Sequence, residues 1–191
     1  VGALLATART RRRNQKEQIM SVKGKKVAIL VEDMYEELEL WYPYYRLLEA
    51  GAQVTLVGPE VKTYASKNGY TAKATLAGKD ARVSEFDAVI VPGGFAPDRL
   101  RRYGAILDLV RGVFEKGGVI GAICHAAWVP ISAGIVKDKR ATCVAAIKDD
   151  LVNAGATYVD QAVVVDDNLI TSRTPADLPH WLPAIIAALS K

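Results

Sequence analysis

Short apolar runs alternate with stretches of helical pattern along this 191-residue chain, and this alternation limits the possible folds more than any other feature. Four apolar runs read as strands buried within a sheet; they span residues 26–31, 53–57, 88–91 and 119–123. Strands separated by helices form parallel sheets through crossover connections. The sequence therefore predicts an α/β fold with a doubly wound, mostly parallel sheet and helices on both faces.

Helices and two hairpins are predicted around these strands. Asn68-Gly69 and residues 166–168 each lie between short strand-like runs, which is a hairpin pattern. Pro179 is tolerated in the first turn of the last helix, whereas Pro183 should kink or delay that helix. The predicted helices cover residues 38–50, 103–115, 148–154 and 177–189, and the further strands cover 140–144, 162–165 and 169–172.

The positive charge of the chain is concentrated near its N-terminus. Residues 1–26 hold eight Lys and Arg and one acid, Glu17; the remainder has 17 basic and 20 acidic residues and a net charge of −3. The total of +4 is therefore poor evidence for a nucleic-acid surface, and none is predicted on the domain. We interpret residues 23–191 as one domain and residues 1–22 as a basic N-terminal extension. The favoured explanation of the extension is that Met20 is the true start of the protein, and a transit peptide is the alternative.

Several classes of protein are disfavoured by what the sequence lacks. Two cysteines, Cys124 and Cys143, do not make a disulfide framework and suit a reducing compartment, so a cytoplasmic location is expected. The cysteines and the two histidines lack metal-ligand spacing, and no glycine-rich nucleotide fingerprint follows the first strand. No segment has the length of a membrane span. We expect no metal, no cofactor and no membrane partner.

Cys124 directly follows the strand at 119–123, and a helix is predicted to begin behind it. A strand-to-helix turn lifts a side chain out of the sheet, and a helix N-terminus stabilises a thiolate. The pattern predicts a nucleophile with a lowered pKa; a buried, inert cysteine is the alternative. Cys143 lies inside a predicted strand and is expected to pack.

Three segments meet at the carboxyl edge of the predicted sheet, where open α/β proteins bind ligands: residues 32–37, Pro92-Gly93-Gly94 and Cys124. One acid of the group Glu32, Asp33, Glu36, Glu37 and Glu39 is expected to be protonated and to donate a hydrogen bond to the thiolate, although periodicity does not select the member. Gly93 and Gly94 permit close backbone approach to an oxyanion, or form a plain turn.

His125 is the nearest candidate base. Adjacent residues of a helix point about 100° apart, so its position alone does not ensure contact with Cys124. A structural histidine and a base oriented by a carboxylate are both compatible with the sequence.

Residues 25–189 resemble the ThiJ/PfpI superfamily and, within it, the PfpI-type intracellular proteases. The match covers nearly the whole domain in order, and its motifs are specific to the family rather than to one activity. The matching stretches are residues 34–40, Tyr42-Pro43, 86–88, 92–94, 96–98, 122–125, 131–134, 147–151, 153–155 and 172–178.

This resemblance implies a flavodoxin-like sandwich of the class I glutamine amidotransferase-like type. Cys124 would be the nucleophile, Glu36 the acid hydrogen-bonded to it, and His125 the histidine of the peptidase-like branch. The backbone of Gly94 and His125 would form the oxyanion hole. Asp98 matches an acid that reaches the histidine of a neighbouring subunit, which implies self-association to a dimer or a dimer-based hexamer.

One departure from the family lies next to the nucleophile. Ala126-Ala127 follows Cys-His where relatives usually have a glycine-containing pair, so the methyl group of Ala126 is expected to narrow the substrate pocket or to perturb the turn.

The resemblance implies a PfpI-type cysteine hydrolase that acts on a peptide or a glycated adduct. Two alternatives use the same thiol: a cofactor-free glyoxalase III acting on a small aldehyde, methylglyoxal, and a non-enzymatic stress protein or chaperone that senses oxidants through sulfinate formation. Glutamine amidotransfer is disfavoured because no His-Glu pair occurs late in the chain.

Overall fold

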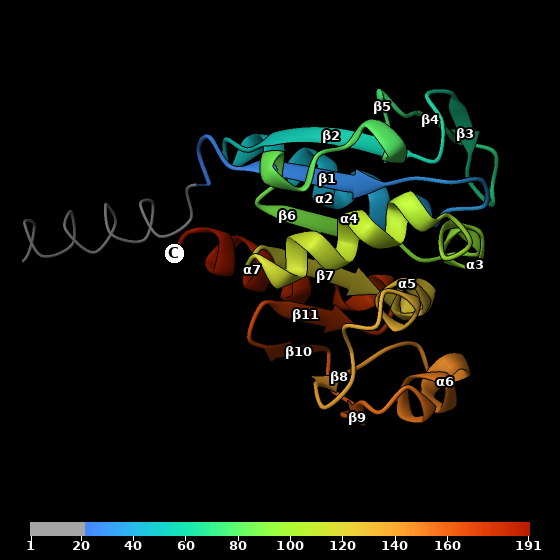
Figure 1. Cartoon of the computed structure of the whole chain (residues 1–191), viewed down its shortest axis with the longest axis vertical. Coiled ribbons are helices and arrows are strands. Elements are labelled where there is room, and N and C mark those ends of the chain that lie inside the picture. Colours follow the sequence, from blue (N-terminus) through green and yellow to red (C-terminus); the bar gives the residue numbers. More distant parts are fainter. Residues whose placement is uncertain (1–21) are drawn as a thin grey trace, which may run out of the picture.

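The computed structural model describes residues 22–191 and contains the predicted sheet (Figure 1). Seven strands lie in the order β10-β11-β7-β6-β1-β2-β5, all parallel except β10, which pairs antiparallel with β11. The flavodoxin-like α/β prediction is confirmed. The strands are β1 Lys26–Leu30, β2 Gln53–Gly58, β5 Leu76–Ala77, β6 Ala88–Val91, β7 Val119–Ile123, β10 Val163–Asp166 and β11 Leu169–Ser172.

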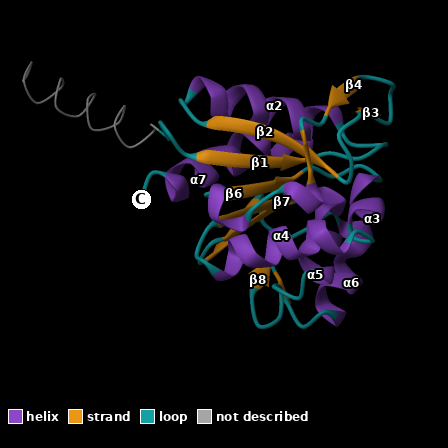
Figure 2. Ribbon diagram, turned by 45° about the horizontal axis from the view of Figure 1, so that its top comes forward, coloured by secondary structure: helices purple, strands orange, loops and turns teal. Residues whose placement is uncertain are grey.

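Helices cover both faces of the sheet (Figures 1 and 2). The helix α4 lies in front of the sheet in Figure 1 and contacts β6 and β7, while α2 and α7 pack against each other on the opposite face. The helices are α2 Glu37–Glu49, α3 Ala96–Leu100, α4 Gly104–Glu115, α5 Trp128–Ser132, α6 Lys148–Asn153 and α7 Leu178–Leu189. No helix within residues 22–191 combines the length and hydrophobicity needed to cross a bilayer.

The core between β7 and α7 depends on a glycine. A Cβ on Gly121 would come within 2.7 Å of Ile185 Cδ1 and 2.8 Å of Ile90 Cδ1, so the bare backbone lets α7 approach the strand. The indole of Trp181 is fully buried there and donates to the carbonyl oxygen of Ile170 at 3.0 Å. A buried indole N–H needs such a partner, and this bond fixes α7 against the sheet.

Both predicted hairpins are present. Asn68-Gly69 lies between β3 Thr63–Ala65 and β4 Thr71–Lys73, and Asp167 turns β10 into β11 with a φ of 52°. Helix α7 begins at Leu178 and continues through Pro183, so the delayed start that was the alternative to a kink does not occur. One strand prediction is wrong: the strand predicted at 140–144 ends earlier, as β8 Arg140–Ala141, which pairs with β9 Thr157–Tyr158.

Cys143 therefore lies just beyond a strand rather than inside one. Its side chain is fully buried, as expected for a packing residue.

Candidate active site

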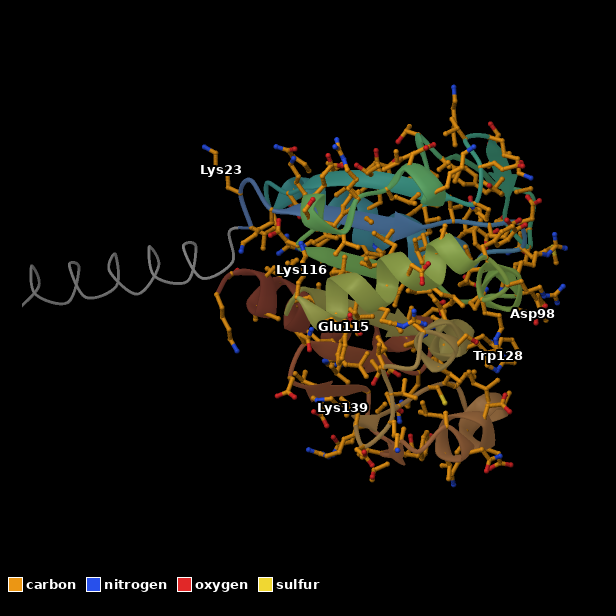
Figure 3. All side chains as sticks on the ribbon, in the orientation of Figure 1. Lys23, Asp98, Glu115, Lys116, Trp128 and Lys139 are labelled. Atoms are coloured by element: carbon orange, nitrogen blue, oxygen red, sulfur yellow. The ribbon has the colours of Figure 1, made fainter. Side chains whose placement is uncertain are left out.

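The carboxyl ends of the parallel strands lie at one edge of the molecule, together with α3, α5 and the β3–β4 hairpin (Figure 1). Figure 3 shows Asp98 and Trp128 at this edge. Three chain segments converge there, as predicted: the loop after β1, the Gly93-Gly94 turn after β6, and Cys124 after β7.

Cys124 occupies a strained turn at the end of β7. Its φ is 63°, in the left-handed region that residues with a Cβ seldom adopt, and the chain continues as a 3-10 turn, Cys124–Ala127, before α5. The backbone N–H groups of His125 and Gly94 donate to the thiol sulfur. The side chain is only partly buried. This is the geometry of a nucleophile elbow, in which strain holds the reactive atom above the sheet.

Burial, and after it the charge of Glu39, raise the pKa of the Cys124 thiol to about 12, although the two backbone N–H groups oppose the shift. The sequence-based expectation of a lowered pKa is wrong. A 3-10 turn followed by a five-residue helix supplies little helix dipole, so desolvation decides the direction. The thiol is therefore protonated at neutral pH.

Glu39 is the carboxyl group beside the thiol. Its side chain is fully buried; Oε2 accepts a hydrogen bond of 2.7 Å from the backbone N–H of Gly93, and the carboxyl interacts with the Cys124 thiol. A Cβ on Gly93 would lie 2.6 Å from Glu39 Oε2 and 2.8 Å from Cys124 Cβ. Glycine at position 93 thus lets the acid and the cysteine meet.

Burial raises the pKa of Glu39 to about 8, and the negative charge of Glu36 adds to this effect, while the Gly93 N–H opposes it. The second oxygen, Oε1, is buried without a hydrogen bond of good geometry to any atom of residues 22–191, which a charged carboxylate would tolerate poorly. At pH 7 Glu39 therefore carries a proton that it can donate toward sulfur or substrate.

The expected role of Glu36 must be reassigned. Glu36 Oε2 forms an ion pair with Lys67 Nζ, which reaches over from the β3–β4 loop, and Glu36 lies one helical turn from Glu39. A usable signal was present in the sequence: Glu39 lies four and eight residues before Pro43 and Leu47, which makes it the acid on the buried stripe of α2. The sequence reasoning also missed Lys67.

His125 contacts the thiol, with 3.4 Å between Nδ1 and Cys124 Sγ. Burial lowers the pKa of the imidazole, and the charge of Lys67 lowers it further. The ring lies between Phe95 and Trp128, with ring-centroid distances of 6.4 and 5.3 Å. A neutral imidazole at this distance can accept the proton that the thiol must lose before it attacks.

The expected roles of Asp98, at an interface with a neighbouring subunit, and of Ala126, beside the substrate, stay predictions. Among residues 22–191, the only ion pair of Asp98 is with Arg102, one turn along its own helix, and its side chain is 45% exposed. Ala126 is fully buried in the 3-10 turn. No cluster of His, Cys, Asp and Glu suited to a metal ion occurs within residues 22–191.

A parallel sheet with a strained cysteine at the carboxyl end of a central strand defines an α/β protein with a nucleophile elbow. A model of the DJ-1/PfpI family matches residues 25–188. The chain belongs to that family, which confirms the resemblance seen in the sequence.

Similar proteins carry names that suggest enzymes. "Deglycase PH1704" of Pyrococcus horikoshii is 40% identical over 164 residues, which are 86% of this chain and 99% of the relative. "Putative cysteine protease YraA" of Bacillus subtilis is 40% identical over 81% of this chain and 92% of the relative. A crystal structure from Anabaena variabilis, a protein with DJ-1/ThiJ/PfpI-like and ferritin-like domains, matches with a TM-score of 0.85 and 42% identity. That match covers 86% of this chain and 48% of the two-domain protein.

Proposed function

We propose that this protein is a cysteine-dependent deglycase, a hydrolase that releases amines or thiols from their adducts with 2-oxoaldehydes. The observation that carries the proposal is the protonated, buried carboxyl group of Glu39 against the Cys124 thiol. The similarity to proteins named deglycases along almost their whole length supports it.

The reaction begins when Cys124 Sγ forms a bond to the carbon that bears the hydroxyl and amine of the adduct. The C–N bond breaks, and the thiol proton reaches the leaving amine through His125, so that a hemithioacetal and a free amine remain. The N–H groups of Gly94 and His125, which point at the sulfur, lie next to the oxygen of the bound carbon.

Glu39 then moves one proton between two carbons. It protonates the oxygen of the adjacent ketone, and the resulting carboxylate removes the proton from the sulfur-bearing carbon, which gives an enediol. Glu39 then protonates the former ketone carbon, and its carboxylate takes the proton of the hydroxyl on the sulfur-bearing carbon, which leaves a thioester of a 2-hydroxy acid and a protonated Glu39. Water hydrolyses this thioester and restores the thiol. The sum is adduct plus water giving amine plus lactate, with no external oxidant or reductant.

Peptide hydrolysis is the second activity that the relatives' names suggest. It requires an imidazolium that protonates a poor leaving group, and an acid that holds that imidazole. Burial lowers the pKa of His125, and within residues 22–191 Asp98 pairs with Arg102. These observations favour the adduct substrate. A role for Asp98 across a dimer or hexamer interface remains part of the peptidase alternative, in which activity depends on self-association.

The test is lactate formation from methylglyoxal adducts of N-acetyllysine, measured together with release of the free amine. We expect Cys124→Ser to abolish turnover and Glu39→Gln to lower kcat about 100-fold or more, as is usual for loss of a general acid–base. Glu36→Gln is the matched control, since it removes a carboxylate one turn away that is paired with Lys67. Equal losses in Glu39→Gln and Glu36→Gln would contradict the assignment of the proton donor.

A scavenger of free methylglyoxal separates two activities that share the product. Lactate that continues to form from a preformed adduct after the free aldehyde is trapped identifies a deglycase. Lactate that stops identifies the glyoxalase III reaction on the aldehyde itself. Absence of lactate in both conditions would overturn the proposal.

A further inference from the structure

An exposed aromatic ring stands beside the candidate nucleophile. Phe95 is 59% exposed, and its position is fixed by its backbone N–H, which donates to the carbonyl oxygen of Met34 at 2.9 Å. The preceding residue, Gly94, has a φ of 77° and directs its N–H at the Cys124 sulfur. Phe95 is therefore one residue away from a group that contacts the reacting atom.

The ring of Phe95 also reaches the site through His125. The two rings are close to parallel, with an interplanar angle of 28° and centroids 6.4 Å apart, and His125 Nδ1 lies 3.4 Å from Cys124 Sγ. A substituent on a carbon bonded to this sulfur can therefore extend past His125 toward the Phe95 ring. Because most of that ring is in solvent, it has apolar surface available for contact.

Single exposed hydrophobic residues are common and by themselves carry no meaning. Phe95 differs in that its ring is stacked on His125, which contacts the nucleophile, and its backbone N–H is bonded to Met34. An aromatic face binds planar apolar groups in offset or edge-on arrangements. A methyl group, by contrast, offers little area to it.

We infer that Phe95 is a specificity-determining residue, which makes the site prefer 2-oxoaldehydes and adducts with an aromatic or bulky apolar group next to the reacting carbon over those derived from methylglyoxal. This inference rests on the proposed function for its substrate class. The contact between Phe95 and a group on the sulfur does not depend on turnover and can be measured separately.

The catalytic test compares kcat/KM for the N-acetyllysine adducts of phenylglyoxal and of methylglyoxal, followed as mandelate and lactate. We expect Phe95→Ala to lower the phenylglyoxal-to-methylglyoxal ratio about three- to tenfold, the usual size of one aromatic contact, and Phe95→Tyr to retain it. Tyr45→Ala is the matched control, because Tyr45 is a similarly exposed ring toward the far end of α2. An equal loss for both substrates in Phe95→Ala would mean that the ring only supports His125, and would overturn the inference.

The second test needs no catalysis. Cys124 is labelled with N-phenylmaleimide and with N-ethylmaleimide, and the Phe95→Ala substitution should lower the ratio of the two rates by a similar factor, while Tyr45→Ala leaves it unchanged. A lowered ratio in a protein that forms no lactate would leave the contact standing and reject the deglycase proposal. If Phe95→Ala leaves the ratio of the two labelling rates unchanged, the inference is overturned, whatever the catalytic activity. This also holds if the substitution lowers the molar mass of the protein in solution, because Phe95 would then contact a second copy of the chain rather than the substrate.

Discussion

At the scale of single residues, the site depends on two groups that are both neutral at rest. Burial raises the pKa of Cys124 and that of Glu39, to about 12 and about 8, so at pH 7 neither carries its charge. The nucleophile is then formed only when His125 or the substrate accepts the thiol proton. Such a site reacts slowly with general thiol reagents and becomes active when a carbonyl substrate is aligned.

Alkylation of Cys124 by iodoacetamide tests this picture. At pH 7 we expect the rate to be below that of free cysteine, because burial holds the thiol protonated. Above pH 8 Glu39 ionises and its charge opposes the thiolate, so Glu39→Gln should react faster than the wild type there while matching it at pH 6. The pH profile of the rate, followed by mass spectrometry, gives the answer.

Glu36→Gln serves as the comparison in the same experiment, and it should change the profile less than Glu39→Gln. A thiol that reacts faster than free cysteine at pH 7 would contradict the neutral resting state.

How much of the site was predictable differs from residue to residue. Cys124 and the Gly93-Gly94 turn follow from local sequence, because a buried strand that ends in a cysteine or in two glycines places them at the sheet edge. The choice of Glu39 over Glu36 depends on which face of α2 packs inward, and only its stripe of buried residues reveals this. The raised pKa of Cys124 depends on burial by distant segments, which no local pattern contains.

At the scale of elements, the β3–β4 hairpin is fastened to the first turn of α2. The Glu37 carboxylate accepts hydrogen bonds from Ser66 Oγ and from the backbone N–H and side-chain amide of Asn68, at 3.2 and 3.0 Å for the latter two. Lys67, between them, thereby reaches Glu36. The Asn-Gly pair predicted the hairpin itself, but its docking on α2 joins residues some thirty positions apart and has no sequence signature.

Replacing Glu37 by alanine should loosen this hairpin. The Ser66 hydroxyl and the Asn68 donors lose their acceptor, so we expect the free energy of unfolding to fall by about 1–3 kcal/mol. Hydrogen exchange at residues 66–70 should rise while the core strands stay protected. Glu49→Ala is the control: its carboxylate is 74% exposed at the other end of α2 and pairs only with Arg46 among the described residues, so a loss below about 0.5 kcal/mol is expected. Unchanged exchange in the hairpin would show that other contacts hold it.

At the scale of the whole molecule, strand-helix alternation predicted a parallel sheet, because few other arrangements bury such strands on both faces. The order of the strands was not predictable in the same way. It places β7 between β6 and β11, so that Cys124 emerges from the interior of the sheet rather than from an edge. That position depends on long-range pairing, and it explains both the burial of the site and its distance from the sheet's open edges.

The buried acid of the site, Glu39, also affects the global stability of the protein. The pKa of Glu39 is raised from an ordinary 4.5 to about 8 in the folded protein, so between these values the folded chain binds a proton that the unfolded chain does not. The stability that this proton contributes is complete below pH 4.5 and is lost as the pH rises through 8. The full loss is on the order of 5 kcal/mol, since one unit of pKa corresponds to about 1.4 kcal/mol.

Glu39→Gln keeps the shape of the side chain but cannot ionise, and so it isolates this contribution from the other groups that titrate. The difference in free energy of unfolding, mutant minus wild type, should increase steadily from pH 5 to pH 8 in urea titrations, which makes the inactive variant the more stable protein in alkaline solution. Glu36→Gln, which removes a carboxylate paired with Lys67, should show no such increase. A difference for Glu39→Gln that stays constant over this range would mean that Glu39 is already ionised in the folded protein. The proton that the proposed reaction takes from it would then have to come from elsewhere.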